Sequence, residues 1–181
     1  YYNNGVVNSF TILESIPSKV PEELNTSSLN IQDNSLPVKL EVEKSSDDLK
    51  TVRTLEDLKK LILLNCDCTL KKTAKNIVFS DGNPKANIMF VGEAPGEFED
   101  KTGKPFKGEA GKLLDKMLNA IQLNRKNVYL TNIIFWRPPG NRKPTEEEIN
   151  VCLPFVKKHI DLIKPKILVL VGAIAAGALL T

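Results

Sequence analysis

Two polar stretches of the sequence hold the residue types best suited to chemistry. The first, from Val91 to Leu114, is rich in glycine and carries a cluster of carboxylates. The second, from Thr131 to Arg142, combines amides, aromatic residues and arginines around a Pro-Pro-Gly turn. Each stretch follows an apolar run that is typical of a buried strand. Loops that leave the carboxyl ends of parallel strands meet at one edge of a sheet, so the two stretches are predicted to build one composite site.

The carboxylates of the first stretch suit a reaction in which positive charge develops. Cleavage of a glycosidic bond passes through an oxocarbenium-like state, which a nearby carboxylate stabilises, and a carboxylate can also orient the attacking water. The same residues fit a solvated loop or the acidic first turn of a helix, and this alternative stays open. The residues concerned are Glu93, Glu97, Glu99 and Asp100.

The glycines of the first stretch do not form a nucleotide-binding phosphate loop. That motif requires a Gly-Lys pair followed by Ser or Thr. The two Gly-Lys pairs, at 103–104 and 111–112, are followed by Pro105 and Leu113. The spacing therefore excludes this class of site.

One aromatic and one amide side chain fit the recognition of a nucleobase. Phe106 lies in a glycine-rich loop, where its ring either stacks on a base that has left its helix or plugs the core. Asn132 ends the second apolar run, and its amide can both donate to and accept from the edge of a base, or cap a turn. Arg137 and Arg142 flank the rigid proline turn and suit phosphates.

Alternating strands and helices must position these loops. The predicted strands are residues 88–91, 128–130 and 167–171. Apolar spacing predicts an amphipathic helix over 113–121, and the capping patterns that begin at Thr54 and Thr145 predict two more. The alternation predicts an α/β fold, with a three-layer α/β/α sandwich around a central, mostly parallel sheet. The chain's histidine, His159, is predicted on the surface or edge of the helix that follows Thr145.

Composition is that of a soluble globular protein. Hydrophobic residues make up 41% of the chain and charged residues 26%, and the net charge of +3 permits a nucleic-acid partner without requiring one. Residues 1–50 are predicted to be a flexible, largely disordered extension with a possible strand at 38–42, and residues 51–181 the α/β domain. No membrane span or leader is evident. The three cysteines favour reduced thiols, hence a cytoplasmic protein of bacterial type, expected as a monomer.

The order and spacing of these motifs resemble the family 4 uracil-DNA glycosylases over residues 66–181. The matching motifs are Glu93-Ala94-Pro95-Gly96, Glu99-Asp100, Pro105-Phe106, Thr131-Asn132 and the Arg-Pro-Pro run with Asn141. The resemblance implies an enzyme that hydrolyses the N-glycosidic bond of uracil in DNA and leaves an abasic site. Uracil-containing DNA is the partner it implies.

The resemblance also implies roles for individual residues. Phe106 is expected to stack on the flipped uracil, and Asn132 is expected to read its edge. The further substrate-binding residues that the resemblance implies are Ala94 and Gly96. The implied catalytic residues are Glu93, Glu99 and Asn141. The implied contacts to the DNA backbone are Arg137 and Arg142.

The chain departs from the family at its cysteines. Members typically hold a 4Fe–4S cluster on four cysteines. Cys68 and Cys152 match two ligand positions, whereas Asn65 stands at another with Cys66 displaced by one residue, and Trp136 replaces the remaining cysteine. The sequence therefore predicts that no cluster or other metal is bound, and the implied cleavage needs no cofactor.

A second departure concerns the end of the chain. The family has a late His-Pro loop whose histidine acts on the departing uracil anion, and this sequence ends before it. The chain is therefore expected to be truncated at its C-terminus, to lack the final strand of the sheet and to leave a sheet edge uncovered. A catalytically impaired remnant that binds uracil or DNA is the alternative function.

Overall fold

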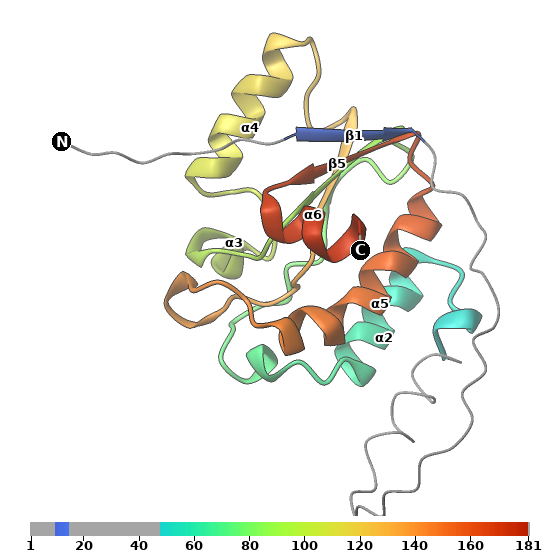
Figure 1. Cartoon of the computed structure of the whole chain (residues 1–181), viewed down its shortest axis with the longest axis vertical. Helices are drawn as coiled ribbons and strands as arrows, with labels where there is room; N and C mark the ends of the chain where they lie inside the picture. The colour runs from blue at the N-terminus through green and yellow to red at the C-terminus, as the bar shows by residue number, and fades with distance from the viewer. Residues whose placement is uncertain (1–9, 15–47, 181) are drawn as a thin grey trace, which may run out of the picture.

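A five-stranded sheet with the order β1-β5-β3-β4-β2 forms the centre of the molecule (Figure 1). The computed structural model describes residues 10–14, for their backbone only, and residues 48–180. The strands are β1 Phe10–Glu14, β2 Asp81–Gly82, β3 Ile88–Gly92, β4 Val128–Asn132 and β5 Ile167–Val171. The central strand β3 is parallel to both β4 and β5, and β1 and β2 join the two edges antiparallel. The predicted α/β class with a mostly parallel sheet is confirmed.

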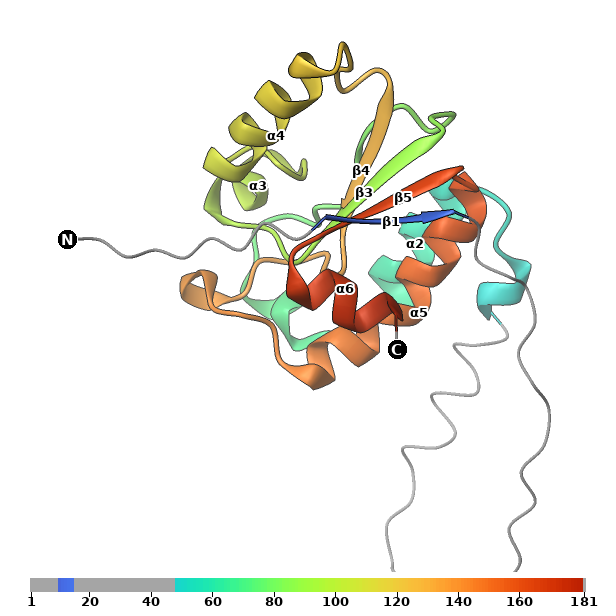
Figure 2. The same ribbon diagram turned by 45° about the horizontal axis from the view of Figure 1, so that its top comes forward.

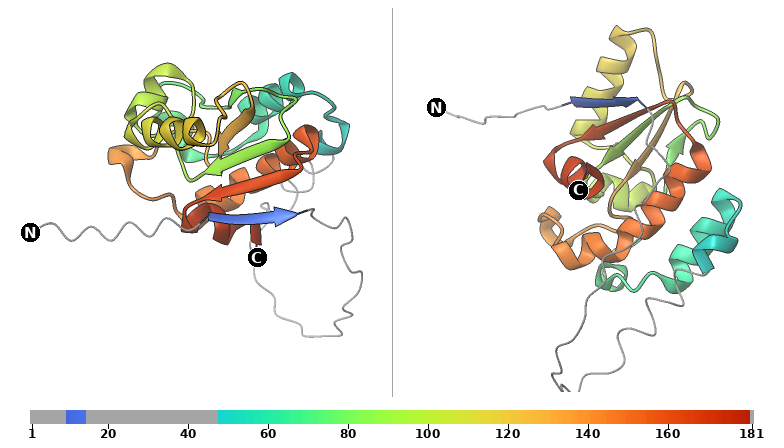
Figure 3. Two further views of the ribbon diagram at one scale, coloured as in Figure 1. Left: turned by 90° about the horizontal axis from the view of Figure 1, so that it is seen from above. Right: turned by 45° about the vertical axis from the view of Figure 1, so that its right-hand side comes forward.

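Helices cover both faces of this sheet, as Figures 2 and 3 show. The α-helices are α2 Leu55–Asn65, α3 Glu97–Thr102, α4 Glu109–Ala120, α5 Glu146–Ile163 and α6 Ala173–Leu180. The 3-10 helices are η1 Thr69–Lys72 and η2 Pro139–Asn141. Helix α4 lies on one face, and α2, α5 and α6 lie on the other. No helix in residues 48–180 is long and apolar enough to span a bilayer.

The alternation of side chains along each central strand divides the core in two. Successive residues of a strand point to opposite faces, so Met89 and Val91 join the core under α2 and α5, whereas Phe90 packs toward α4. Both sets are buried, because helices cover both faces. This explains why the strands read as continuous apolar runs.

The predicted caps of two helices are confirmed. Thr54 Oγ1 accepts a hydrogen bond of 3.1 Å from the Asp57 backbone N–H at the start of α2. At the start of α5, Thr145 Oγ1 accepts from the Glu148 N–H, and the Glu148 carboxylate accepts from the Thr145 N–H in return. Each bond satisfies a backbone donor that the first helical turn leaves without a partner.

The expectation of an uncovered sheet edge is wrong. Strand β1 pairs antiparallel along the whole of β5, from Phe10 opposite Val171 to Glu14 opposite Ile167. The segment Phe10–Glu14 is rich in the aromatic and β-branched residues that favour strands, so its sequence holds a signal for β1 that the prediction of a disordered extension did not use. The possible strand at 38–42 lies outside the described residues.

The expectation that His159 lies at the surface is also wrong. Its side chain is 0% exposed, on the face of α5 that packs against the sheet. The Tyr129 hydroxyl lies 2.7 Å from its Nε2, and its ring stacks on Phe79 with centroids 4.4 Å apart. The strand residue Tyr129 thus provides a polar partner for Nε2 and the loop residue Phe79 an apolar one for the ring, whereas Nδ1 has no hydrogen-bond partner among the described residues.

Fewer apolar residues of helix α4 are buried than the apolar spacing over residues 113–121 predicts. Leu114 and Leu118 are buried against the sheet. Leu113, Met117 and Ile121 are 52%, 39% and 64% exposed. Among the described helices, α4 alone contributes buried side chains to the core on that face, and only its residues directly over the strands are enclosed.

Candidate active site

The carboxyl ends of β3 and β4 bring the two predicted loops together. The parallel register places Gly92 beside Asn132. The pairing then continues past the strands, because the Ile133 N–H donates to Gly92 O at 2.8 Å and the Ile134 N–H donates to Glu93 O at 3.0 Å. The two loops therefore leave the sheet side by side.

Gly92 provides the space in which an amide and an aromatic ring meet. A Cβ at this position would lie 2.5 Å from Asn132 Oδ1 and 2.7 Å from Phe106 Cζ, so no larger residue fits without displacing one of them. Asn132 is buried and Phe106 is partly buried. A glycine at the junction between a strand and a polar loop is the sequence signal for such a close approach.

Glu99 connects two segments of the first loop by hydrogen bonds to their backbone. Its carboxylate accepts three backbone hydrogen bonds, from the N–H groups of Gly96 at 3.1 Å and of Lys107 and Gly108 at 2.7 Å each. The side chain is 9% exposed. Because a carboxylate that accepts several N–H groups is fixed in place, Glu99 holds the start of α3 against the segment that carries Phe106.

Glu93 has a different environment from Glu99. It is half-buried at the end of β3, and burial raises the pKa of its carboxyl above the ordinary value, with the Lys143 ammonium acting in the opposite direction. A carboxylate in this state can take a proton from a bound water or face a developing cation.

The remaining predicted pocket residues, Ala94 and Gly96, lie between Glu93 and Glu99 along the chain. Ala94 is partly buried and packs against the larger core. Gly96 begins α3 as its N-cap, and its N–H is already bonded to Glu99. Both belong to the turn that connects β3 to α3, so both lie in the loop that carries Glu93.

In the second loop Asn141 and Arg142 are exposed and Arg137 is partly buried. Asn141 has a positive φ of 56° and is exposed, and its Oδ1 accepts a 2.7 Å hydrogen bond from Arg137 Nε. Arg137 also lies 3.8 Å from the Glu97 carboxylate of α3. Arg142 forms two hydrogen bonds with Glu148, of 2.6 and 2.9 Å. Both guanidiniums are thus positioned by carboxylates.

The cysteines do not form the ligand set of a four-thiolate cluster. Cys66 Sγ and Cys152 Sγ are 3.9 Å apart, and all three cysteines are buried. Contact with the Cys66 and Cys68 thiols and burial together raise the pKa of the Cys152 thiol. The buried Trp136 packs edge-on against Phe135, and an indole N–H is a donor that cannot ligate iron. Within residues 48–180, no group of three or more His, Cys, Asp or Glu side chains is arranged to hold a metal ion.

Comparisons with known proteins agree on one family. The family model described as the uracil DNA glycosylase superfamily matches residues 79–181. A type-4 uracil-DNA glycosylase of Sulfurisphaera tokodaii is 49% identical over 120 residues, which cover 66% of this chain and 54% of that protein. Those of Pyrobaculum aerophilum and Archaeoglobus fulgidus are 44% and 46% identical, over 68% and 69% of this chain and 65% and 63% of theirs. The chain thus spans between about half and two thirds of the length of these relatives.

Proposed function

Since the chain belongs to the uracil DNA glycosylase superfamily, we propose that the whole protein hydrolyses the N-glycosidic bond of uracil in DNA and leaves an abasic site. The observation that carries this proposal is the meeting of Asn132 and Phe106 over Gly92. An amide edge and an aromatic face at one point are the two elements needed to hold a base outside its helix. The type-4 names of the relatives support the same substrate.

The base is held by stacking and by hydrogen bonds. The Phe106 ring replaces the stacking that uracil loses when it leaves the helix. The Asn132 amide donates to a uracil carbonyl and accepts from the N3–H, and Ala94 and Gly96 form the adjacent wall of the pocket. Cytosine presents a donor where uracil has a carbonyl, so the same amide disfavours cytosine.

The chemical step is assigned to the carboxylates and amide of the two loops. Glu93 orients the attacking water and stabilises the oxocarbenium-like sugar, supported by its half-buried carboxylate, whose pKa burial raises. Glu99 contributes by fixing the loop around the pocket through its three backbone bonds. Asn141 lies beside Arg137 and approaches the sugar once DNA is bound.

The DNA partner is bound through its phosphates by Arg137 and Arg142. Both lie on the proline turn next to the pocket, and Arg142 retains an exposed side chain although Glu148 positions it. We further propose that the protein acts as a monomer in the cytoplasm. No metal and no 4Fe–4S cluster takes part in the cleavage. This is consistent with the three cysteines of the chain, because Trp136 occupies the position of a cluster-ligating cysteine.

The test of this function is release of uracil from a labelled oligonucleotide. The assay compares this 181-residue chain with a version extended to the length of its relatives, on strands that carry a single uracil or a thymine. We expect the extended protein to leave abasic sites at uracil only. The 181-residue chain is expected to bind the uracil strand with little or no turnover. Failure of the extended protein to cleave either strand would disprove the proposed activity, and binding without cleavage would identify a uracil-binding protein.

Truncating Phe106 to Ala is expected to weaken binding of the uracil strand by roughly 1–3 kcal/mol, the usual value of one base–aromatic stack. The dissociation constant of a uracil-containing oligonucleotide measures this effect. Phe98→Ala is the matched control, because Phe98 is an exposed phenylalanine of the neighbouring helix α3. A large fall in melting temperature with unchanged uracil binding would instead show that Phe106 serves the core.

A further inference from the structure

Arg125, which lies in the loop between α4 and β4, contacts the backbone of the loop that carries Phe106. Its Nη1 donates to Pro105 O at 3.2 Å, and its Nη2 donates to Phe106 O. Its side chain is 19% exposed. No other described side chain donates to these two carbonyls.

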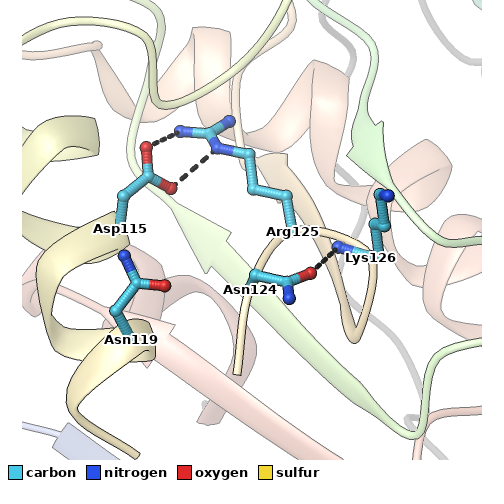
Figure 4. A pocket seen from close by; sticks show the side chains of 5 residues that line it. All are labelled: Asp115, Asn119, Asn124, Arg125 and Lys126. Carbon is cyan, nitrogen blue, oxygen red and sulfur yellow. Dashed lines mark hydrogen bonds and ion pairs between the residues drawn. The ribbon is translucent and has the colours of Figure 1, made fainter. Parts of the chain in front are cut away.

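Two carboxylates fix this guanidinium. Asp115 of α4 accepts from Nε at 2.8 Å and from Nη2 at 3.2 Å, and Asp81 of β2 accepts from Nη1 at 2.9 Å. Figure 4 shows the two-pronged contact with Asp115, at the side of a surface cavity of about 420 Å³. The fork of N–H groups can satisfy two carboxylates and two carbonyls at once, which a lysine ammonium cannot do.

Phe106 needs such support because its backbone is strained. Its φ of 55° lies in the left-handed region, which residues other than glycine rarely adopt. The loop is also pressed against the first turn of α4, since a Cβ at Gly111 would lie 1.9 Å from Phe106 O. An unusual backbone conformation persists only where the surroundings over-determine it.

The loop is held from two sides. On one side Glu99 accepts from the N–H groups of Lys107 and Gly108, which follow Phe106. On the other side Arg125 donates to the carbonyls of Pro105 and Phe106. The peptide groups before and after the Phe106 ring are therefore both anchored, which leaves the ring directed at Gly92 and Asn132.

We propose that Arg125, held by Asp115 and Asp81, is a positioning residue that fixes the Phe106 ring over Gly92 and thereby sets the preference of the site for uracil. Arg125 touches neither base nor sugar in this role, and it acts through Phe106. The link to uracil rests on the proposed function, whereas the clamp on the loop does not.

The experiment replaces Arg125 by Lys in the full chain and measures three quantities. These are the hydrogen exchange of backbone amides in residues 103–111, the dissociation constants for a uracil and a thymine oligonucleotide, and the urea midpoint of unfolding. We expect faster exchange in the loop and a loss of about tenfold in the preference for uracil, within the range of one base–aromatic stack. Thymine binding and the urea midpoint change little. Arg53→Lys, at an exposed arginine before α2, is the matched control.

A double-mutant cycle with Phe106→Ala separates positioning from a general loss of structure. If Arg125 acts through the ring, Arg125→Lys has no further effect on uracil preference once the ring is absent. An equal loss in both backgrounds would overturn the proposal. If Arg125→Lys does not fold, Asp115→Asn is used instead, because it removes a charge that fixes the guanidinium. We expect the same changes in hydrogen exchange and uracil preference, at smaller size. No change in either quantity would also overturn the proposal.

The outcomes distinguish this proposal from the proposed function. If the unsubstituted chain shows no preference for the uracil strand, the proposed function fails and the hydrogen exchange still tests the clamp. If the unsubstituted chain prefers uracil and Arg125→Lys alters neither exchange nor preference, the clamp is wrong and the function stands.

Discussion

Replacing Asn132 by Asp is expected to reduce uracil binding and excision by roughly 1–3 kcal/mol, or about 5- to 150-fold. The amide has a donor for a uracil carbonyl, and an ionised carboxylate has none. The position is only 3% exposed, so the carboxylate would carry its charge into a poorly solvated site. A negative charge there would also oppose the uracil anion that leaves when the bond breaks.

Two measurements check this prediction. The dissociation constant for a uracil oligonucleotide tests the 181-residue chain, and the single-turnover rate of excision tests the extended protein. Asn150→Asp serves as the control, because Asn150 is an exposed amide on α5. Wild-type excision by Asn132→Asp would show that another group reads the base.

The stability of the protein is expected to fall steeply as the pH drops below about 6.5, because of His159. Burial lowers the pKa of His159 to about 3, with its Nδ1 lacking any partner among the described residues. The unfolded chain therefore binds a proton between about pH 6.5 and 3 that the folded chain does not. The stabilisation is fully present above the unfolded pKa and is lost as the pH falls through this window, at up to about 1.4 kcal/mol per pH unit.

Urea unfolding of the wild type and of His159→Gln between pH 4.5 and 8 tests this effect. Glutamine does not titrate and can still bond the Tyr129 hydroxyl, whose own pKa burial raises to about 12. The chain has one histidine, so the difference between the two pH profiles reports this side chain alone. Lys158→Gln, on the adjacent position of α5, is the control. Identical slopes for wild type and His159→Gln would show that His159 protonates in the folded state.

Much of the fold could be predicted from local sequence patterns. The three central strands are mostly apolar, because helices cover both faces of the sheet, and β4 departs from this only at Thr131 and Asn132, where it enters the site. The capping residues Thr54 and Thr145 marked two helix starts, because a cap depends on side chains three residues apart. These patterns depend on residues close together in the sequence, so they can be recognised without knowing which distant residues each element packs against.

The adjacency of the two functional loops could also be anticipated. Parallel strands end at the same edge, so residues that follow β3 and β4 must lie near each other. The register then places Gly92 beside Asn132. The sequence by itself therefore determined the class of fold, the loops that carry the candidate site and the residue types within them.

Only the tertiary structure decided which partner each polar side chain has. Glu93 and Glu99 have the same side chain in the same loop, yet Glu99 accepts three backbone N–H groups whereas Glu93 is left half-buried. His159 is enclosed because Tyr129 and Phe79, 30 residues or more away along the chain, meet it in space. Arg125 reaches Phe106 from another loop, 19 residues later. Hydrogen bonds between distant residues leave no periodic pattern in the sequence, so these roles become visible only when the chain is folded.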